Sequence, residues 1–168
     1  MYKYRADRVK TTLIITLLLL FPLHVFSGPL SEEKRKIHFN LNSTGVAIQG
    51  FDPVSYFDGK ATRGKKSIAF MYKGITYLFS SKRNLEVFKQ SPGTYEPAYG
   101  GWCAWAMREG EKVAINPERF KIVNKRLYLF YDRFFTNTLK KWNKLAEEKT
   151  ENILIEKADT HWCNLTKE

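Results

Sequence analysis

The stretch from residue 72 to residue 95 constrains the fold more than any other part of this 168-residue chain. Two runs rich in aromatic and β-branched residues meet at Lys73-Gly74, which predicts a tight turn between antiparallel strands. Ser80 or Ser81 can cap a helix directly afterwards by accepting backbone N–H bonds. Pro92-Gly93 is expected to end that helix. A hairpin followed at once by a short helix indicates an α+β domain.

Similar patterns recur along the chain. They predict a short strand from Val46, a helix over 102–108, a second hairpin over 120–131 with its turn at Asn124-Lys125, and a longer helix capped by Asp132. The apolar positions of that longer helix repeat at helical spacing: Phe135, Leu139, Trp142 and Leu145. Without a repeat or linker, the chain is expected to form one small α+β domain. Antiparallel hairpins would pack with short helices and one longer C-terminal helix.

The N-terminus has the pattern of a secretory signal peptide. Four cations lie within residues 1–10, an apolar run covers 13–26, and small residues follow. The alternative to a signal peptide is an uncleaved membrane anchor. The apolar run is shorter than the roughly 20 residues that a membrane-spanning helix needs, which favours the signal peptide. We therefore expect a signal peptide over 1–27, a flexible leader over 28–44 and a domain over 45–165. The protein is expected to be exported, either periplasmic or secreted.

The charge balance is basic. The chain has 28 Lys and Arg against 17 Asp and Glu, and removal of residues 1–27 leaves 24 against 16, a net charge of +8. Export argues against nucleic acid as a partner, and the charges are spread out, which indicates a solvated surface. Weak contact with an anionic membrane surface is an alternative. The sequence names no partner beyond an unknown protein or a metal ion, and it does not give the oligomeric state.

Several stretches in the same order resemble a known family. Residues 45–57 read GVAIQGFDPVSYF, residues 72–95 carry the hairpin and helix, and residues 99–106 read YGGWCAWA. Together with later matches up to Trp162, they resemble exported YHS-domain proteins over residues 45–163. YHS domains are similar to small cysteine modules that bind metal beside copper and heavy-metal transporters.

The resemblance also implies what this chain lacks. The cysteines of the metal-binding relatives fall on Ser55, Ser80 and Asn84. Serine and asparagine offer hard oxygen atoms, which cannot hold a soft metal as thiolates do. The family's metal site is therefore expected to be absent, while its scaffold persists.

Two cysteines remain, Cys103 and Cys163. In an oxidising compartment they can form a disulfide that ties down the C-terminal tail. Alternatively, they can hold copper together with Met107, four residues after Cys103 on one helix face, and His161 in the tail. A third alternative is a lone reactive thiol at Cys103, near a helix N-terminus.

Four aromatic residues around Cys103 can either line a pocket or belong to the core: Tyr95, Tyr99, Trp102 and Trp105. No paired carboxylates, nucleophile motif or phosphate loop appears, so an enzyme is not expected. The first hypothesis is an exported, non-catalytic YHS-like accessory protein that binds or handles metal, with copper as the candidate cofactor. The alternative is a structural or interaction module that lost metal binding and is stapled by a Cys103–Cys163 disulfide.

Overall fold

The computed structural model describes residues 30–167 of the chain. The expected signal peptide lies outside this part. The helices and strands, in chain order, are α1 (Glu32–His38), β1 (Lys65–Tyr72), β2 (Ile75–Phe79), α2 (Lys82–Gln90), α3 (Pro92–Tyr95), α4 (Ala104–Met107), β3 (Asn116–Val123), β4 (Arg126–Phe130), β5 (Asp132–Arg133), β6 (Thr136–Asn137), α5 (Thr138–Lys149) and α6 (Glu151–Lys167). The predicted fold class is confirmed: the chain is a small α+β domain of antiparallel two-stranded hairpins, short helices and a longer C-terminal helix.

Each hairpin turns through two residues with left-handed backbone angles. The first turn is Lys73-Gly74, with φ of 45° and 77°, and the second is Asn124-Lys125, with φ of 50° and 60°. Such turns match the twist of the strands that they connect. Both turns were predicted from the sequence. The third hairpin, β5–β6, turns at Phe134-Phe135 and was not predicted.

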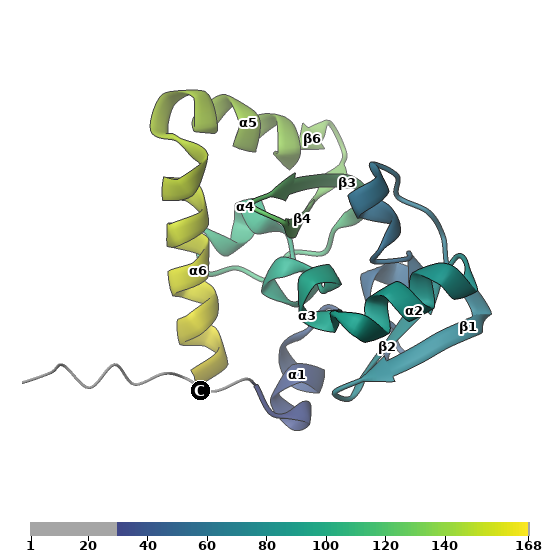
Figure 1. Ribbon diagram of the computed structural model, residues 1–168. Helices are drawn as coiled ribbons and strands as arrows, with labels where there is room; N and C mark the ends of the chain where they lie inside the picture. The colour runs from purple at the N-terminus through teal and green to yellow at the C-terminus, as the bar shows by residue number, and fades with distance from the viewer. Residues whose placement is uncertain (1–29, 168) are drawn as a thin grey trace, which may run out of the picture.

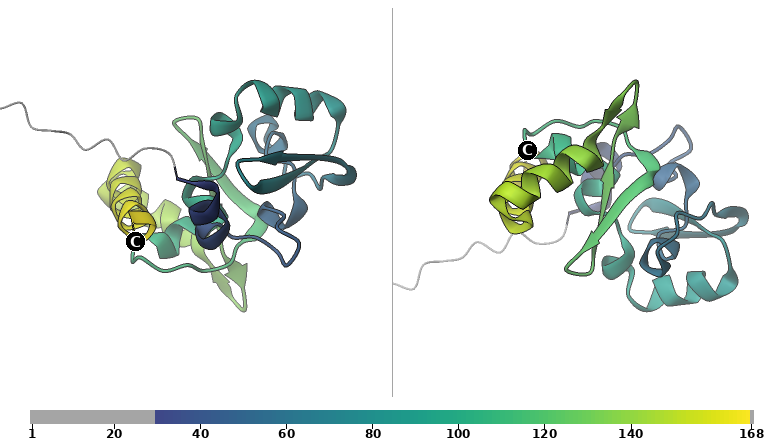
Figure 2. Two further views of the ribbon diagram at one scale, coloured as in Figure 1. Left: turned by 90° about the horizontal axis from the view of Figure 1, so that it is seen from below. Right: turned by 90° about the horizontal axis from the view of Figure 1, so that it is seen from above.

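The two larger hairpins lie in different halves of the molecule (Figure 1). Hairpin β1–β2 packs with α2, whereas α4 and α5 contact hairpin β3–β4 and α6 packs against these two helices (Figures 1 and 2). The segment between α3 and α4 runs beside β4, with parallel bridges from Pro97 to Leu127 and from Cys103 to Leu129. Two clusters of buried side chains form the core, one mainly in each half.

The helix that follows the first hairpin begins as predicted but continues differently. Ser81 caps α2, since its Oγ accepts a bond from the backbone N–H of Asn84. Helix α2 ends before Pro92, but Pro92 itself lies in the first turn of another short helix, α3. A backbone N–H in the first turn has no partner within the helix, so the N–H that proline lacks is not needed there. The short strand expected from Val46 is reduced to isolated bridges of Val46 with Thr76 and of Ala47 with Leu41, because residues 48–50 already form a 3₁₀ turn.

The longer helix begins later than predicted. Asp132 starts β5 instead of capping a helix, and α5 begins at Thr138 with Asn137 as its cap. Phe135 was expected in the core but is fully exposed at the β5–β6 turn. Trp142, which shared its predicted helical stripe, is fully buried.

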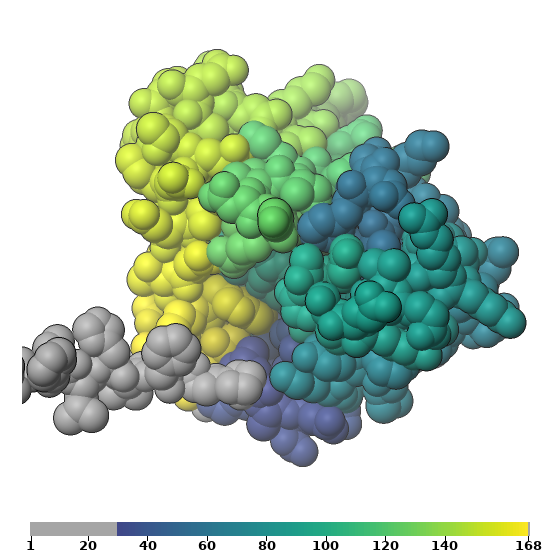
Figure 3. All heavy atoms as spheres, viewed as in Figure 1, coloured from purple at the N-terminus to yellow at the C-terminus, as the bar shows by residue number. Residues whose placement is uncertain are grey.

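The segment expected to be a flexible leader carries a packed helix, α1. Ser31 caps it, Glu32 and Glu33 lie in its first turn, and basic residues lie in its last, which all favour the helix. Arg35 of α1 is only 6% exposed. Figure 3 shows α1 between the lower part of α6 and the half that contains β1–β2. The leader was therefore assigned too little structure.

The C-terminal tail is helical over its whole described length. Thr150, with φ of 67°, separates α5 from α6. Leu154, Ile155 and Ala158 bury one side of α6 in the core. Within residues 30–167, no helix combines the length and apolar character that crossing a membrane requires.

Candidate functional site

A buried carboxylate lies where the resemblance places the family's cysteines. The side chain of Asp52 is fully buried. Its Oδ2 accepts bonds from Ser80 Oγ (2.6 Å), the Ser80 backbone N–H (2.8 Å) and Asn84 Nδ2 (2.7 Å). Its Oδ1 accepts the backbone N–H of Val54 at 2.9 Å. None of the ion pairs between described residues involves Asp52, so hydrogen bonds alone compensate its burial.

Ser55 completes this arrangement, which we call the Asp52 cluster: Asp52, Ser55, Ser80 and Asn84. The Oγ of Ser55 donates to the main-chain oxygen of Asp52 at 2.8 Å and accepts the backbone N–H of Thr62 at 3.1 Å. Ser55, Ser80 and Asn84 thus all contact one residue. The cluster is satisfied within itself and offers no thiolate.

Local structure brings these side chains together. The 3₁₀ turn over Ser55–Asp58 points Ser55 back at Asp52. Ser80 directly follows β2 and Asn84 lies on the first turn of α2, so the hairpin-to-helix junction supplies both. Asn84 also lines a hollow of about 240 Å³ together with Tyr95. The cluster therefore borders the surface on its Asn84 side.

Cys103 lies elsewhere and is fully buried. Its Sγ accepts the backbone N–H of Tyr131 at 3.3 Å and lies 3.4 Å from Thr138 Oγ1. Cys103 is also the N-cap residue of α4. These contacts make it an internal support for the chain around β5–β6, in contrast to the exposed reactive thiol that was one alternative.

The four predicted copper ligands do not form a site in the structure. Met107 is fully buried in the core cluster that contains Trp142. His161 and Cys163 are two residues apart on α6, about 200° around the helix axis, so their side chains diverge. No group of three or more His, Cys, Asp or Glu side chains within residues 30–167 is arranged to hold a metal ion.

The alternative role of the cysteines was a disulfide. The structure has Cys103 and Cys163 as free cysteines, the first buried and the second half-buried. The tail is held instead by the packing of α6, including Trp162 against Phe39 and Tyr99.

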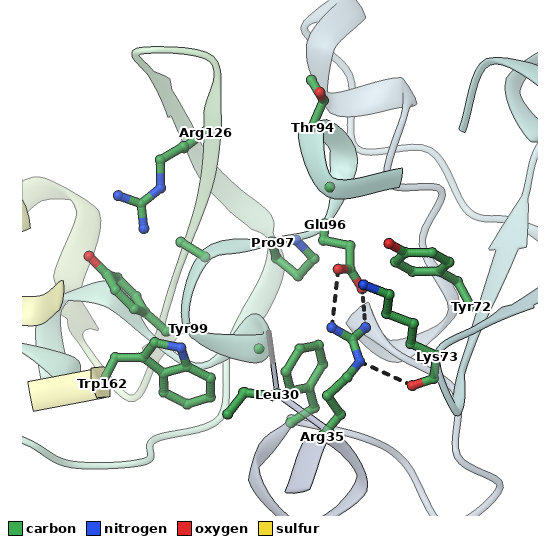
Figure 4. A pocket seen from close by; sticks show the side chains of 14 residues that line it. Leu30, Arg35, Tyr72, Lys73, Thr94, Glu96, Pro97, Tyr99, Arg126 and Trp162 are labelled. Carbon is green, nitrogen blue, oxygen red and sulfur yellow. Dashed lines mark hydrogen bonds and ion pairs between the residues drawn. The ribbon is translucent and has the colours of Figure 1, made fainter. Parts of the chain in front are cut away.

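A cleft of about 360 Å³ with charged side chains in its walls lies between α1, the turn of β1–β2 and α6 (Figure 4). On one wall, Arg35 forms a double hydrogen bond with Glu96 and donates its Nε to the Lys73 carbonyl at 3.0 Å. Tyr99 and Trp162 form the opposite wall. The cleft thus combines aromatic and charged side chains.

Charges in the cleft are largely paired. Tyr77 donates its hydroxyl to Glu96 Oε1 at 2.5 Å. Burial, together with the nearby Glu96 carboxylate, holds the pKa of Tyr77 well above its usual value. On the rim, Arg126 forms two bonds of 2.9 Å with Asp159. Because these cations already have carboxylate partners, the cleft presents no free cluster of positive charge.

The predicted aromatic pocket is dispersed. Tyr99 lines the cleft of Figure 4, Tyr95 lines the hollow beside Asn84, and Trp105 lines a shallow apolar recess next to α5. Trp102 donates its indole N–H to the carbonyl of His38, which links the segment before α4 to the end of α1. These residues therefore contribute to three different surfaces.

Two features of the structure escaped the sequence reasoning. Asp52 was not identified as a buried acceptor, although it lies within the resembling stretch over residues 45–57. The Arg35–Glu96 pair was missed because Arg35 lies in the assumed leader. The mixed charges of residues 32–36, typical of a short capped helix, were the available signal.

Comparisons with known proteins add no relative to this picture: no family model, no curated protein and no solved structure matches the chain.

Proposed function

We propose that this chain is a non-catalytic YHS-like interaction module in which the Asp52 cluster takes the place of the thiolate metal site. The observation that carries the proposal is that Ser55, Ser80 and Asn84 all bond to Asp52. These are the positions aligned with metal-binding cysteines. A carboxylate that already accepts four hydrogen bonds has little capacity left for a metal ion or for proton transfer.

Copper binding through Cys103 is less well supported. Its sulfur is buried and already contacts Tyr131 and Thr138, while the tail ligands diverge on α6. Export to the periplasm or medium belongs to the same proposal and rests on the sequence pattern of residues 1–27. A module of this kind acts by contact with a partner, through surfaces such as the cleft of Figure 4.

Restoring the cysteines tests this proposal. The protein beginning at Gly28 is titrated with Zn²⁺ and with Cu⁺, and we expect no stoichiometric binding. The variant Ser55→Cys/Ser80→Cys/Asn84→Cys should bind one metal ion, because Ser80 Oγ and Asn84 Nδ2 are only 3.4 Å apart. Loss of the Ser80 and Asn84 donors also frees Asp52 as a further ligand.

The double variant Ser80→Cys/Asn84→Cys serves as a second test if the triple variant folds poorly. Metal binding by neither cysteine variant would overturn the assignment of these positions. Stoichiometric copper binding by the unmodified protein that disappears in Cys103→Ser would instead establish the metal-handling alternative.

A further inference from the structure

The turn of hairpin β5–β6 presents two phenylalanines to solvent. Phe134 is 86% exposed and Phe135 is 113% exposed, the highest values among the large apolar side chains in the described part of the chain. The other large apolar residues that are exposed, such as Met71, occur singly on other elements. Adjacent, fully exposed aromatic rings at the tip of a hairpin are a costly feature unless something covers them.

The backbone of this turn is also unfavourable for its residues. Phe134 and Phe135 have φ of 48° and 65°, the left-handed region. Turns of this kind favour Asn-Gly or Asp-Gly, and bulky residues adopt such angles at a cost. The chain therefore sacrifices local stability to place two aromatic rings here. Such strain is characteristic of functional positions.

Contacts at the base hold the hairpin in place. The Thr138 hydroxyl donates to the Tyr131 carbonyl at 2.9 Å, and the buried Sγ of Cys103 lies under both residues. Asp132 is ion-paired with Arg119 of β3. The tip is thus displayed on a fixed base.

Exposed cations lie close to the tip along the chain. Arg133 precedes the two phenylalanines directly. Lys140 and Lys141 lie in the first turn of α5, and this turn contains no acidic residue. A helix N-terminus normally favours anions, so these lysines are placed against the helix dipole. Their positions complement a negatively charged surface that approaches the tip.

The size of the apolar tip distinguishes between possible occupants. Two phenylalanine side chains offer about 300–500 Å², whereas a stable protein interface needs roughly 800 Å² from each partner. A lipid bilayer sets no such requirement, since apolar side chains can enter the headgroup and acyl boundary while cations remain among the headgroups. The small convex tip therefore fits a membrane surface better than a protein groove.

We propose that the β5–β6 tip is a membrane-contact site, with Phe134 and Phe135 inserting into an anionic phospholipid surface and Arg133, Lys140 and Lys141 binding its headgroups. The interaction is peripheral and reversible. It is independent of the role assigned to the Asp52 cluster.

Vesicle binding tests the proposal. The protein beginning at Gly28 is used, because the apolar run over 13–26 would itself bind lipid, and both core clusters lie within the described residues. It is mixed with vesicles of phosphatidylglycerol and phosphatidylcholine in equal parts, and co-sedimentation is measured. The variant Phe134→Asn/Phe135→Gly should bind the vesicles at least about tenfold more weakly than the parent. Each phenylalanine that leaves water for the bilayer contributes a favourable transfer free energy, which the variant loses. Because Asn-Gly favours this turn, the variant should fold at least as stably as the parent.

Two further comparisons separate the contributions. Met71→Ser removes an exposed apolar side chain from β1 and should leave vesicle binding unchanged. Arg133→Gln/Lys140→Gln/Lys141→Gln, or vesicles of phosphatidylcholine alone, should weaken binding, and added salt should do the same for the parent.

The outcomes are decisive in both directions. Binding that is lost with the two phenylalanines and retained in Met71→Ser supports the site. Equal binding by the Phe134→Asn/Phe135→Gly variant places any lipid contact elsewhere and overturns the proposal. Absence of vesicle binding by the parent protein also overturns it and leaves the tip to a protein partner.

Discussion

At the scale of single residues, Asp52 is a buried charged group that depends on hydrogen bonds from its neighbours. Its carboxylate is fully buried and has no cationic partner between residues 30 and 167. Four donors from two separate segments compensate it. Those donors, of which the Val54 N–H is buried and those of Ser80 and Asn84 are half-buried, would in turn lose their acceptor, so the cluster stabilises the fold only while it is complete.

We expect Asp52→Ala to destabilise the protein strongly. The free energy of unfolding should fall by about 2–4 kcal/mol, because one buried donor and three half-buried donors lose their acceptor at once. Urea denaturation measures the change. Asp58→Ala, at an exposed turn residue close by, is the matched control and should change stability by less than about 0.5 kcal/mol. Equal effects of the two substitutions would contradict the role given to Asp52.

The two thiols should differ in reactivity. Cys163 is half-buried and should react with a thiol reagent in the native protein, whereas Cys103 is buried and should react only after unfolding. Thiol counting without reductant, before and after denaturant, measures both. Two thiols in denaturant agree with the structure, and none would establish the disulfide.

The sequence could indicate part of the site but not its centre. Aligned motifs picked out Ser55, Ser80 and Asn84 as positions that belong together. Asp52 was not recognised as the acceptor that joins them, because Asp-Pro is equally typical of a simple turn. Only the packing of α2 against the 51–58 segment makes its carboxylate the common partner.

At the scale of elements, Arg35 is one of the residues that attach α1 to the domain. Its guanidinium pairs with Glu96, donates to Lys73 and lies 4.4 Å from the ring centroid of Phe39. The side chains of Arg35 and Glu96 are 8% and 14% exposed. In the same cleft, Arg126 and Asp159 form a similar pair at 44% and 42% exposure.

These two pairs permit a direct comparison. Arg35→Ala should lower the free energy of unfolding by about 3 kcal/mol or more, because it leaves Glu96 buried without its cation. Arg126→Ala should cost less than about 1 kcal/mol, since water screens the exposed pair. Chemical denaturation of both variants measures the difference. If Arg35→Ala proved as mild as Arg126→Ala, α1 would be the loose leader that the sequence suggested.

The hairpins illustrate which elements a sequence can predict. Lys73-Gly74 and Asn124-Lys125 contain residues that tolerate left-handed angles, so both turns were recognisable. Phe134-Phe135 contains none, and the spacing of Phe135 with Leu139 and Trp142 indicated a helix instead. The base contacts of Tyr131 and Thr138 with Cys103 come from far along the chain and are not visible in local patterns.

At the scale of the whole molecule, buried tyrosines make the stability of the fold depend on pH. Burial raises the pKa of Tyr128 to about 12 and holds the pKa values of Tyr56, Tyr77 and Tyr99 above their usual value. In the unfolded chain these hydroxyls ionise near 10.0, the ordinary value for tyrosine. Above that pH the unfolded state binds fewer protons than the folded state, so stability falls as pH rises.

We therefore expect tyrosine ionisation to leave the free energy of unfolding unchanged below about pH 9 and to lower it steadily above about pH 10. Urea denaturation across this range, with tyrosinate absorbance followed in parallel, measures the effect. The absorbance of the buried tyrosines should rise together with unfolding. Full ionisation of all tyrosines near pH 10 in a protein that stays folded would contradict their burial.

The Asp52 cluster has a consequence for how the molecule matures. A domain centred on a thiolate metal site must wait for its ion to be delivered, and its cysteines can be oxidised before the ion arrives. Carboxylate, hydroxyl and amide groups have neither dependence. This chain carries the whole of its polar centre in its own side chains. Formation of the Asp52 cluster therefore requires neither a metal ion nor a reduced thiol.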